Sequence, residues 1–190
     1  MTYTPYIYTV QYAPVAMALT RAQILDATLQ IAESDGLDAV SMRAVARRLG
    51  VTPMALYNHV EDKQALLDGL VERLLEELPI PDPRLPWQDR LRSLAAGLRA
   101  TARRHPDAFL MLLRRPATTP ASKKRRELVY EALRDAGVPD RDIPRVERLL
   151  STFMLGFAAS EAGGRFAEHD RETLDGDLAW AQDLVLAARR

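Results

Sequence analysis

Residues 41–60 have the sequence SMRAVARRLGVTPMALYNHV, and this stretch decides the fold. Ser41 and Thr52 are residue types that cap helix N-termini, and Gly50 between them suits a turn with positive φ. Pro53 then falls in the first turn of the second helix, where no N–H is needed. Two short helices joined by a tight glycine-containing turn form a helix-turn-helix, the motif that places its second helix in the major groove of DNA.

The charge around this stretch is unevenly distributed. Residues 17–78 hold six basic and ten acidic residues, a net charge of −4, whereas 41–60 holds three arginines and no acid. An acidic unit with one acid-free basic face favours DNA binding through that face. Because helix-turn-helix geometry also occurs as plain packing, the structural alternative stays open at this point.

Helix signals continue on both sides of the stretch. Thr20 and Gln23 predict a capping box that opens a helix ending at Gly36, and Glu61 or Asp62 opens another. Four prolines between 79 and 86 exclude a helix there. We therefore expect a helix-turn-helix domain over 17–78, a proline-rich connection over 79–86 and a second domain over 87–190.

The second domain is also predicted to be helical. Apolar residues at helical spacing predict helices over 87–104, 106–113, 122–136, 140–162 and 171–189, and no segment alternates with period two. The fold class is therefore all-α, with about nine helices. Residues 1–16 hold four of the six tyrosines and no charge. We interpret them as a flexible tail or a start assigned upstream of Met17, with a DNA- or partner-binding arm as the alternative.

Composition excludes several classes of protein. The 190 residues include 26 basic and 26 acidic side chains, no cysteine and three histidines, which leaves no disulfide, thiol nucleophile or thiolate zinc site. There is no glycine-rich phosphate loop, metal-ligand spacing or base–nucleophile pair. We expect no cofactor, no metal and no enzyme, with a helical enzyme behind a helix-turn-helix as the alternative. No export or membrane segment is evident, and a cytoplasmic protein is expected.

Several runs of the sequence together resemble the tetracycline-repressor (TetR) family of transcriptional regulators. Over 17–78 the resemblance rests on ILDA at 24–27, AE at 32–33, GL at 36–37, SMRAVARRLGV at 41–51, ALYNHV at 55–60, and Lys63, Leu66 and Leu67. A weaker likeness to the tetracycline-repressor-like C-terminal domain rests on Trp87, RHP at 104–106, RP at 115–116 and FMLGF at 153–157. It implies a homodimer that binds double-stranded DNA.

The resemblance also implies which residues contact DNA. The residues expected to face bases or groove walls are Arg43, Thr52, Pro53, Met54, Ala55 and Asn58. Those expected to hold phosphates are Ser41, Tyr57, His59 and Lys63. Phosphate contacts fix the register and base-edge contacts carry sequence information. Arg43 is the strongest candidate for a direct base contact, to guanine.

Three departures bear on the effector. At the positions where the tetracycline repressor has histidines for its magnesium-bound drug, this chain has Met111, Thr152 and Pro79. A chelated tetracycline is therefore not expected, and the apolar second domain favours an uncharged or amphipathic effector. The expected pocket residues, for which the alternative is ordinary core, are Trp87, Leu91, Leu94, Leu98, Phe109, Leu110, Leu113, Leu128, Phe153, Met154 and Phe157.

The two last helices are expected to pair with their symmetry mates, as the family resemblance implies. The expected interface residues are Leu149, Leu150, Phe157, Leu178, Leu184 and Val185, with an intrachain core as the alternative. Residues 99–126 hold nine basic residues and one acid. This basic cluster is interpreted as an exposed, solvated face, with extra DNA contacts or the entry of an anionic effector as alternatives.

The function predicted from these observations is sequence-specific DNA binding by a transcriptional regulator. We expect a repressor that a small apolar or amphipathic effector releases from a palindromic operator, because the effector would shift the spacing of the two recognition helices. A regulator that answers a protein partner, or an activator, is the alternative.

Overall fold

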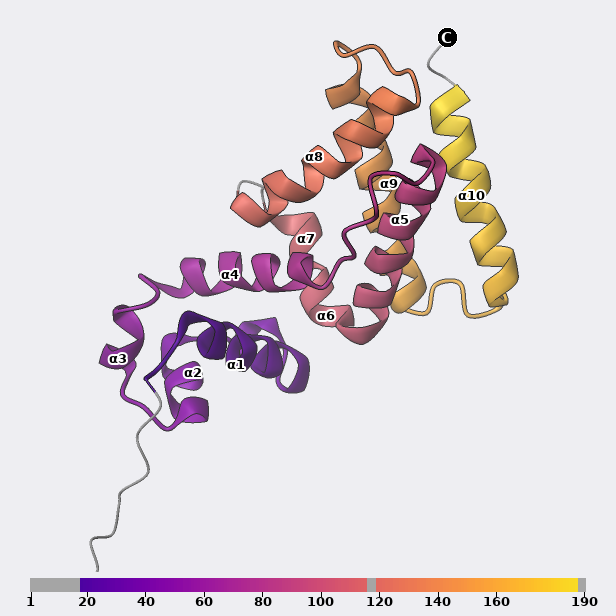
Figure 1. Ribbon diagram of the computed structural model, residues 1–190. Helices are drawn as coiled ribbons and strands as arrows, with labels where there is room; N and C mark the ends of the chain where they lie inside the picture. Colours follow the sequence, from indigo (N-terminus) through magenta and orange to yellow (C-terminus); the bar gives the residue numbers. More distant parts are fainter. Residues whose placement is uncertain (1–17, 116–118, 188–190) are drawn as a thin grey trace, which may run out of the picture.

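A computed structural model describes residues 18–115 and 119–187, and the predicted tail over 1–16 lies outside this part of the chain. The helices form two bodies (Figure 1). A smaller body holds α1 to α4, and a larger one holds α5 to α10. α4 runs from the small body to the large one and contacts α6, α7 and α8, so it is the mechanical link between them.

The small body forms as the sequence predicts. The Thr20 side chain accepts from the Gln23 N–H while the Gln23 side chain accepts from the Thr20 N–H, which confirms the capping box. Asp62 caps the fourth helix through the Ala65 N–H. The elements are α1 (Arg21–Ser34), a 3₁₀ turn η1 (Leu37–Ala39), α2 (Met42–Leu49), α3 (Pro53–Tyr57) and α4 (Lys63–Glu76).

One apolar core holds the small body together. Leu56 of the short α3 is fully buried against residues of α1, α2 and α4. Gly69 lets α1 and α4 approach closely, because a Cβ there would lie 2.2 Å from Leu25 Cδ2. The other large side chains of this core include Ile24, Val45, Leu66, Leu70 and Leu74. Burial of this kind contributes about 1.5–3 kcal/mol per large apolar side chain.

The large body is built on α5 and α9, which pack along each other, with α8 and α10 against α9. Its elements are α5 (Trp87–Arg104), α6 (Pro106–Phe109), α7 (Met111–Arg114), α8 (Pro120–Asp135), α9 (Ile143–Ala162) and α10 (Arg171–Ala187). Three details differ from expectation. The helix predicted over 140–162 begins only at Ile143. The helix predicted over 106–113 is divided at Leu110. α8 begins two residues early, because Thr119 accepts from the Ser122 N–H.

The all-α fold class is confirmed, and no strand occurs in the part of the chain described above. Among the same residues, no helix is both long and apolar enough to cross a bilayer.

Candidate nucleic-acid interface and ligand cavity

The turn between α2 and α3 has the geometry that its sequence predicts. Gly50 is left-handed, with φ 67° and ψ 27°. Its N–H donates to Arg47 O at 3.3 Å, and the Val51 N–H donates to Ala46 O at 3.0 Å. This is the paired bonding of a Schellman motif, which satisfies the last carbonyls of α2 and turns the chain sharply. α3 is thereby held across α2 at the end of the small body away from α5–α10 (Figure 1).

α3 presents one face to solvent and one to the core. Leu56 is buried, whereas Met54 is 73% and Tyr57 50% exposed. Thr52, Pro53 and Asn58 are also exposed, and Ala55 is half-buried. Of the residues expected to reach base edges or groove walls, Thr52, Pro53, Met54 and Asn58 are therefore exposed along or beside α3, whereas Arg43 belongs to α2.

The candidate phosphate ligands surround that helix. Ser41 caps α2, its hydroxyl oxygen accepting from the Ala44 N–H at 3.2 Å, which leaves its O–H for an outside acceptor. Thr52 stands at the N-cap of α3 but its side chain makes no capping bond, so its hydroxyl is also available. Lys63, the first residue of α4, is exposed, and His59 is half-buried. Hydroxyls, amides and cations at helix N-termini suit phosphate oxygens.

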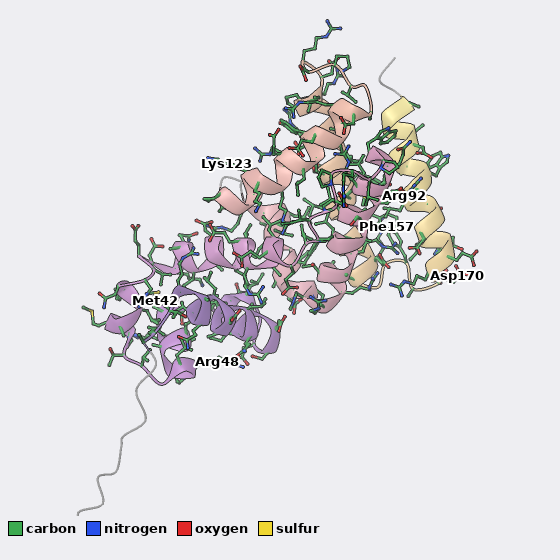
Figure 2. All side chains as sticks on the ribbon, viewed as in Figure 1. Met42, Arg48, Arg92, Lys123, Phe157 and Asp170 are labelled. Carbon is green, nitrogen blue, oxygen red and sulfur yellow. The ribbon has the colours of Figure 1, made fainter. Side chains whose placement is uncertain are left out.

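The arginines of α2 have different surroundings. Arg43 and Arg47 are exposed, and neither forms a hydrogen bond or ion pair with another side chain within 18–115 and 119–187. Arg48 is exposed as well (Figure 2), but its Nε donates to Gln30 Oε1 of α1 at 3.1 Å. The guanidinium of Arg43, near the N-terminus of α2, is therefore not engaged by any other described side chain.

A cavity of about 140 Å³ lies in the large body where it meets α4. Its apolar wall consists of Leu75, Leu78, Leu94, Leu98, Val129 and Leu155. Its polar wall consists of Ser122, Arg125, Arg126, Glu147 and Ser151. Apolar walls with a few placed polar groups are typical of sites for small molecules.

Only two of the predicted pocket residues, Leu94 and Leu98, line this cavity. Others are used elsewhere. Leu91 and Met154 are buried in a second core, against which Trp87 and Phe157 pack, and Phe157 lies inside the large body (Figure 2). Phe109 is buried in a third cluster. Leu113 and Phe153 are exposed, and Leu110 and Leu128 are half-buried without lining the cavity. Helical spacing alone does not separate pocket from core, because both need apolar side chains.

The basic cluster is not one solvated face, which corrects the interpretation given for 99–126. Lys123 and Lys124 are exposed, but Arg99 is buried and Arg125 and Arg126 are half-buried. Several of its members hold the two bodies together. Arg104 pairs with Glu77 at 2.6 Å, and Arg115 pairs with Asp68 at 2.6 Å. Acidic residues of the small body, at α4 and its C-terminal end, therefore form ion pairs with basic residues of 99–126.

His105 makes a further contact between the bodies that the sequence did not reveal. It is buried at the end of α5, and its ring contacts Glu33 of α1 through Nδ1 and Glu77 through Nε2. The RHP sequence at 104–106 gave no sign of this role, since the carboxylates come from distant parts of the chain.

An ion cluster centred on the buried Arg99 joins α5, α9 and α10. Arg99 of α5 donates to both carboxylate oxygens of Glu161 and also contacts Asp175 of α10. The hydrogen bond from Arg99 holds the pKa of Glu161 below its ordinary value. No group of three or more His, Asp or Glu side chains in the described chain is arranged to hold a metal ion.

α9 and α10 leave large apolar side chains in solvent. Leu149 is 58% and Leu184 54% exposed, as an interface would need. Leu150 and Leu178 are buried in the second core, so their burial is intrachain, and Phe157 packs on the same core. Val185 belongs to α10 but its side chain lies outside the described residues. Trp180, 67% exposed, was not singled out in the sequence, because an isolated tryptophan gives no sign of which helix face it occupies.

Comparison with known proteins gives two matches to family models. Residues 24–70 match the model described as bacterial regulatory proteins, tetR family. Residues 80–182 match the tetracyclin repressor-like C-terminal domain.

Curated relatives are transcriptional regulators. The chain is 30% identical over 178 residues to the HTH-type transcriptional repressor DrrR1 of Streptomyces coeruleorubidus, covering 90% of this chain and 66% of that protein. It is 31% identical over 145 residues to an HTH-type transcriptional regulator of Saccharopolyspora erythraea, covering 76% and 61%. The chain thus spans slightly under two thirds of the length of these relatives.

Solved structures share the fold. BioQ of Mycobacterium smegmatis superposes with a TM-score of 0.78 at 24% identity, covering 90% of this chain and 97% of the other. ActR of Streptomyces coelicolor, solved in complex with actinorhodin, superposes with a TM-score of 0.75 at 24% identity, covering 91% and 96%.

Proposed function

The chain belongs to the tetracycline-repressor (TetR) family, and from that premise we propose that it is a sequence-specific DNA-binding transcriptional regulator. The observation that carries the proposal is the helix-turn-helix itself, in which Gly50 sets α3 with its outward face exposed and free of acidic residues. In this proposal residues 17–78 form the DNA-binding domain, and residues 79–86 connect it to the second domain. Residues 87–190 bind the effector and form the dimer.

The contacts with DNA follow from the exposed groups. Arg43 would give a bidentate contact to guanine, and the apolar Met54 and Ala55 would meet thymine methyl groups. Ser41, Tyr57, His59 and Lys63 would hold phosphates on both sides of the groove. The helix therefore reads few bases by hydrogen bonds, and much of the affinity would come from the backbone contacts and depend on salt.

The partner in DNA binding would be a second copy of the chain. Two recognition helices must reach successive major grooves about 34 Å apart, which requires a two-fold dimer and a palindromic operator. The exposed apolar residues of α9 and α10, Leu149, Phe153, Trp180 and Leu184, support pairing through these helices.

The action would be repression relieved by a small molecule. The cavity is lined by residues of α4, α5, α8 and α9, so it adjoins the helix that links the small body to the large one. A ligand there can change how α4 is held and so the spacing of the two recognition helices. The leucine-rich wall supports an apolar or amphipathic effector.

The proposal is tested with DNA selected from a random library by the purified chain. The selected duplex, fluorescently labelled, is titrated with protein by anisotropy at several salt concentrations, with unrelated DNA as competitor. Competitor-resistant binding to a palindrome is expected. Selection of no common sequence, with binding that competitor DNA removes, would contradict the proposed function.

A further inference from the structure

Arg125 of α8 holds the end of α4. Its Nη1 donates to Pro79 O at 2.8 Å and its Nη2 to Glu76 O at 3.4 Å. The last carbonyls of a helix lack intrahelical partners and carry partial negative charge, so a cation there stabilises the end of the helix. Arg125 therefore acts as a cap that the large body supplies to the last helix of the small body.

Pro79 also packs closely against α5. Gly97 of α5 lies against the proline ring so closely that a Cβ there would be 2.3 Å from Pro79 Cδ. The segment after α4 is thus held between α5 and the guanidinium of Arg125. Because the ring cannot move toward α5, we expect a displacement of Arg125 either to shift the carbonyls that it binds or to break these two hydrogen bonds.

Arg125 differs from Arg104 and Arg115 in the groups that its guanidinium binds. Arg104 and Arg115, which also reach the small body from the large one, each pair with a carboxylate. Within 18–115 and 119–187, no carboxylate forms an ion pair with Arg125, whose two hydrogen bonds described above go to neutral carbonyls. Burial lowers the pKa of its guanidinium, and the carboxylate of Glu76 partly opposes this effect. Since a guanidinium has five N–H donors, several remain for another acceptor.

The same side chain lines the cavity beside the leucines. A half-buried cation that forms no ion pair binds a carboxylate more strongly than a neutral group. The single acid of the lining, Glu147, already accepts from Ser151 Oγ at 2.9 Å, and it would repel a second negative charge. The lining therefore suits an apolar body with one anionic group.

We propose that the cavity binds an amphipathic monoanion, a ring or short chain bearing one carboxylate or equivalent group, and that Arg125 joins this group to the end of α4. The inference rests on the proposed function, because it names the effector class and the residue that transmits its binding. A volume of about 140 Å³ accommodates a group near the size of benzene, which occupies engineered apolar cavities of about 150 Å³.

The effector class is tested with three molecules that share one chain: octanoate, 1-octanol and octylammonium. Binding to the full chain is measured by isothermal titration calorimetry without DNA. Octanoate is expected to bind about ten-fold more tightly than octanol, the value of one charge-assisted hydrogen bond, and octylammonium most weakly. In Arg125→Met the two affinities should become equal, and in Glu147→Gln octanoate should bind more tightly than in the original chain.

The matched control is Lys124→Met, an equal loss of charge at an exposed residue of the same helix, which should keep the preference for octanoate. Equal binding of the three molecules, binding of none, or a preference that survives in Arg125→Met would overturn the assignment. This assay contains no DNA, so its result is independent of whether the chain selects an operator.

The transmission through Arg125 is tested by adding the selected operator duplex at saturation. Because coupling between sites is reciprocal, the duplex should change the affinity for octanoate by about five-fold or more. Arg125→Lys should keep the preference for an anion yet lose most of this coupling, because an ammonium group cannot hold two carbonyls and a carboxylate in one plane. Coupling of the original size in Arg125→Lys and Arg125→Met would overturn this part of the inference.

Discussion

The small and large bodies bury their apolar residues to different extents. α1 to α4 enclose Leu56, Leu66 and Leu70 in one core, and the large apolar side chain most open to solvent there, Met54, lies on the recognition helix. The large body leaves Leu149, Trp180 and Leu184 in solvent although it has a buried apolar core of its own. The small body is therefore complete within one chain and open to a polar partner, whereas the large body has an apolar surface that a second copy would cover.

The largest effect is expected from changing that apolar surface. Trp180→Arg combined with Leu184→Arg places two charges one turn apart on α10 and should convert a dimer to monomers. Affinity for the palindrome should fall by at least about 10³-fold, to the level of non-specific binding. Sedimentation and anisotropy measure the two effects. Ile80→Arg is the control, since Ile80 is equally exposed but lies in the connection. A variant that stays dimeric would place the interface elsewhere.

The next largest effect, on stability, is expected from disrupting the ion cluster of Arg99, which lies within the large body. Glu161→Gln leaves the buried guanidinium with Asp175 alone, and unfolding free energy should fall by about 3 kcal/mol. Because the folded pKa of Glu161 lies below its ordinary value of 4.5, the stabilisation is present above that value and lost as pH falls through the folded pKa. The acid sensitivity of stability should thus be smaller in the variant.

Chemical denaturation at a series of pH values measures this difference, with Glu168→Gln, an equal change at an exposed residue, as the control. Equal stability of Glu161→Gln and the control would show that the cluster contributes nothing net.

The sequence predicted the small body more fully than the large one, for a physical reason. Its helix ends are set by local signals, the Thr20–Gln23 box, the Ser41 cap and the left-handed Gly50, which act within a few residues. In the large body no capping side chain marks the division of the predicted helix at Leu110. The early start of α8 does follow a local signal, Thr119 at the N-cap with Pro120 in the first turn, which apolar spacing alone did not reveal.

The site shows the same contrast. The exposed face of α3 follows from helical spacing, since the burial of Leu56 fixes where Met54 and Tyr57 point. The cavity could not be predicted in this way, because its wall combines leucines of α4, α5 and α9 with Arg125 from another helix. The contacts of His105 and the ion pairs of 99–126 likewise join residues far apart in the sequence, so charge counting revealed an excess but not its partners.

Within the small body, Arg43→Ala should relax specificity at one operator position. The loss of a bidentate base contact costs about 1–3 kcal/mol for the preferred sequence and less for the variant base pair. Competition between duplexes that differ at single positions measures this change. Arg47→Ala, on the same helix, removes the same charge and should weaken all duplexes alike. An unchanged preference in Arg43→Ala would show that Arg43 reads no base.

Replacing one helical glycine in each body by alanine compares how closely the helices pack at the two positions. Gly69→Ala places a Cβ 2.2 Å from Leu25 Cδ2, and the required shift, offset by the better helix propensity of alanine, should cost about 1 kcal/mol. Gly156→Ala on α9 meets no atom within 4 Å and should stabilise the single chain by up to about 1 kcal/mol. Thermal unfolding of the two variants gives the comparison. Equal shifts in Tm would mean that α1 adapts to the added methyl group.

The smallest effects concern the phosphate contacts. Lys63→Ala removes an exposed charge at the start of α4, so affinity should fall similarly for every duplex and the salt slope should decrease by about 1. Tyr57→Phe removes only a hydroxyl, which should weaken all duplexes without changing the slope, because a neutral donor releases no counterion. The pair therefore separates charge from hydrogen bonding at the same surface. An unchanged salt slope in Lys63→Ala would show that Lys63 contacts no DNA phosphate. The phosphate contacts of the small body would then be assigned to Ser41, Thr52 and Tyr57.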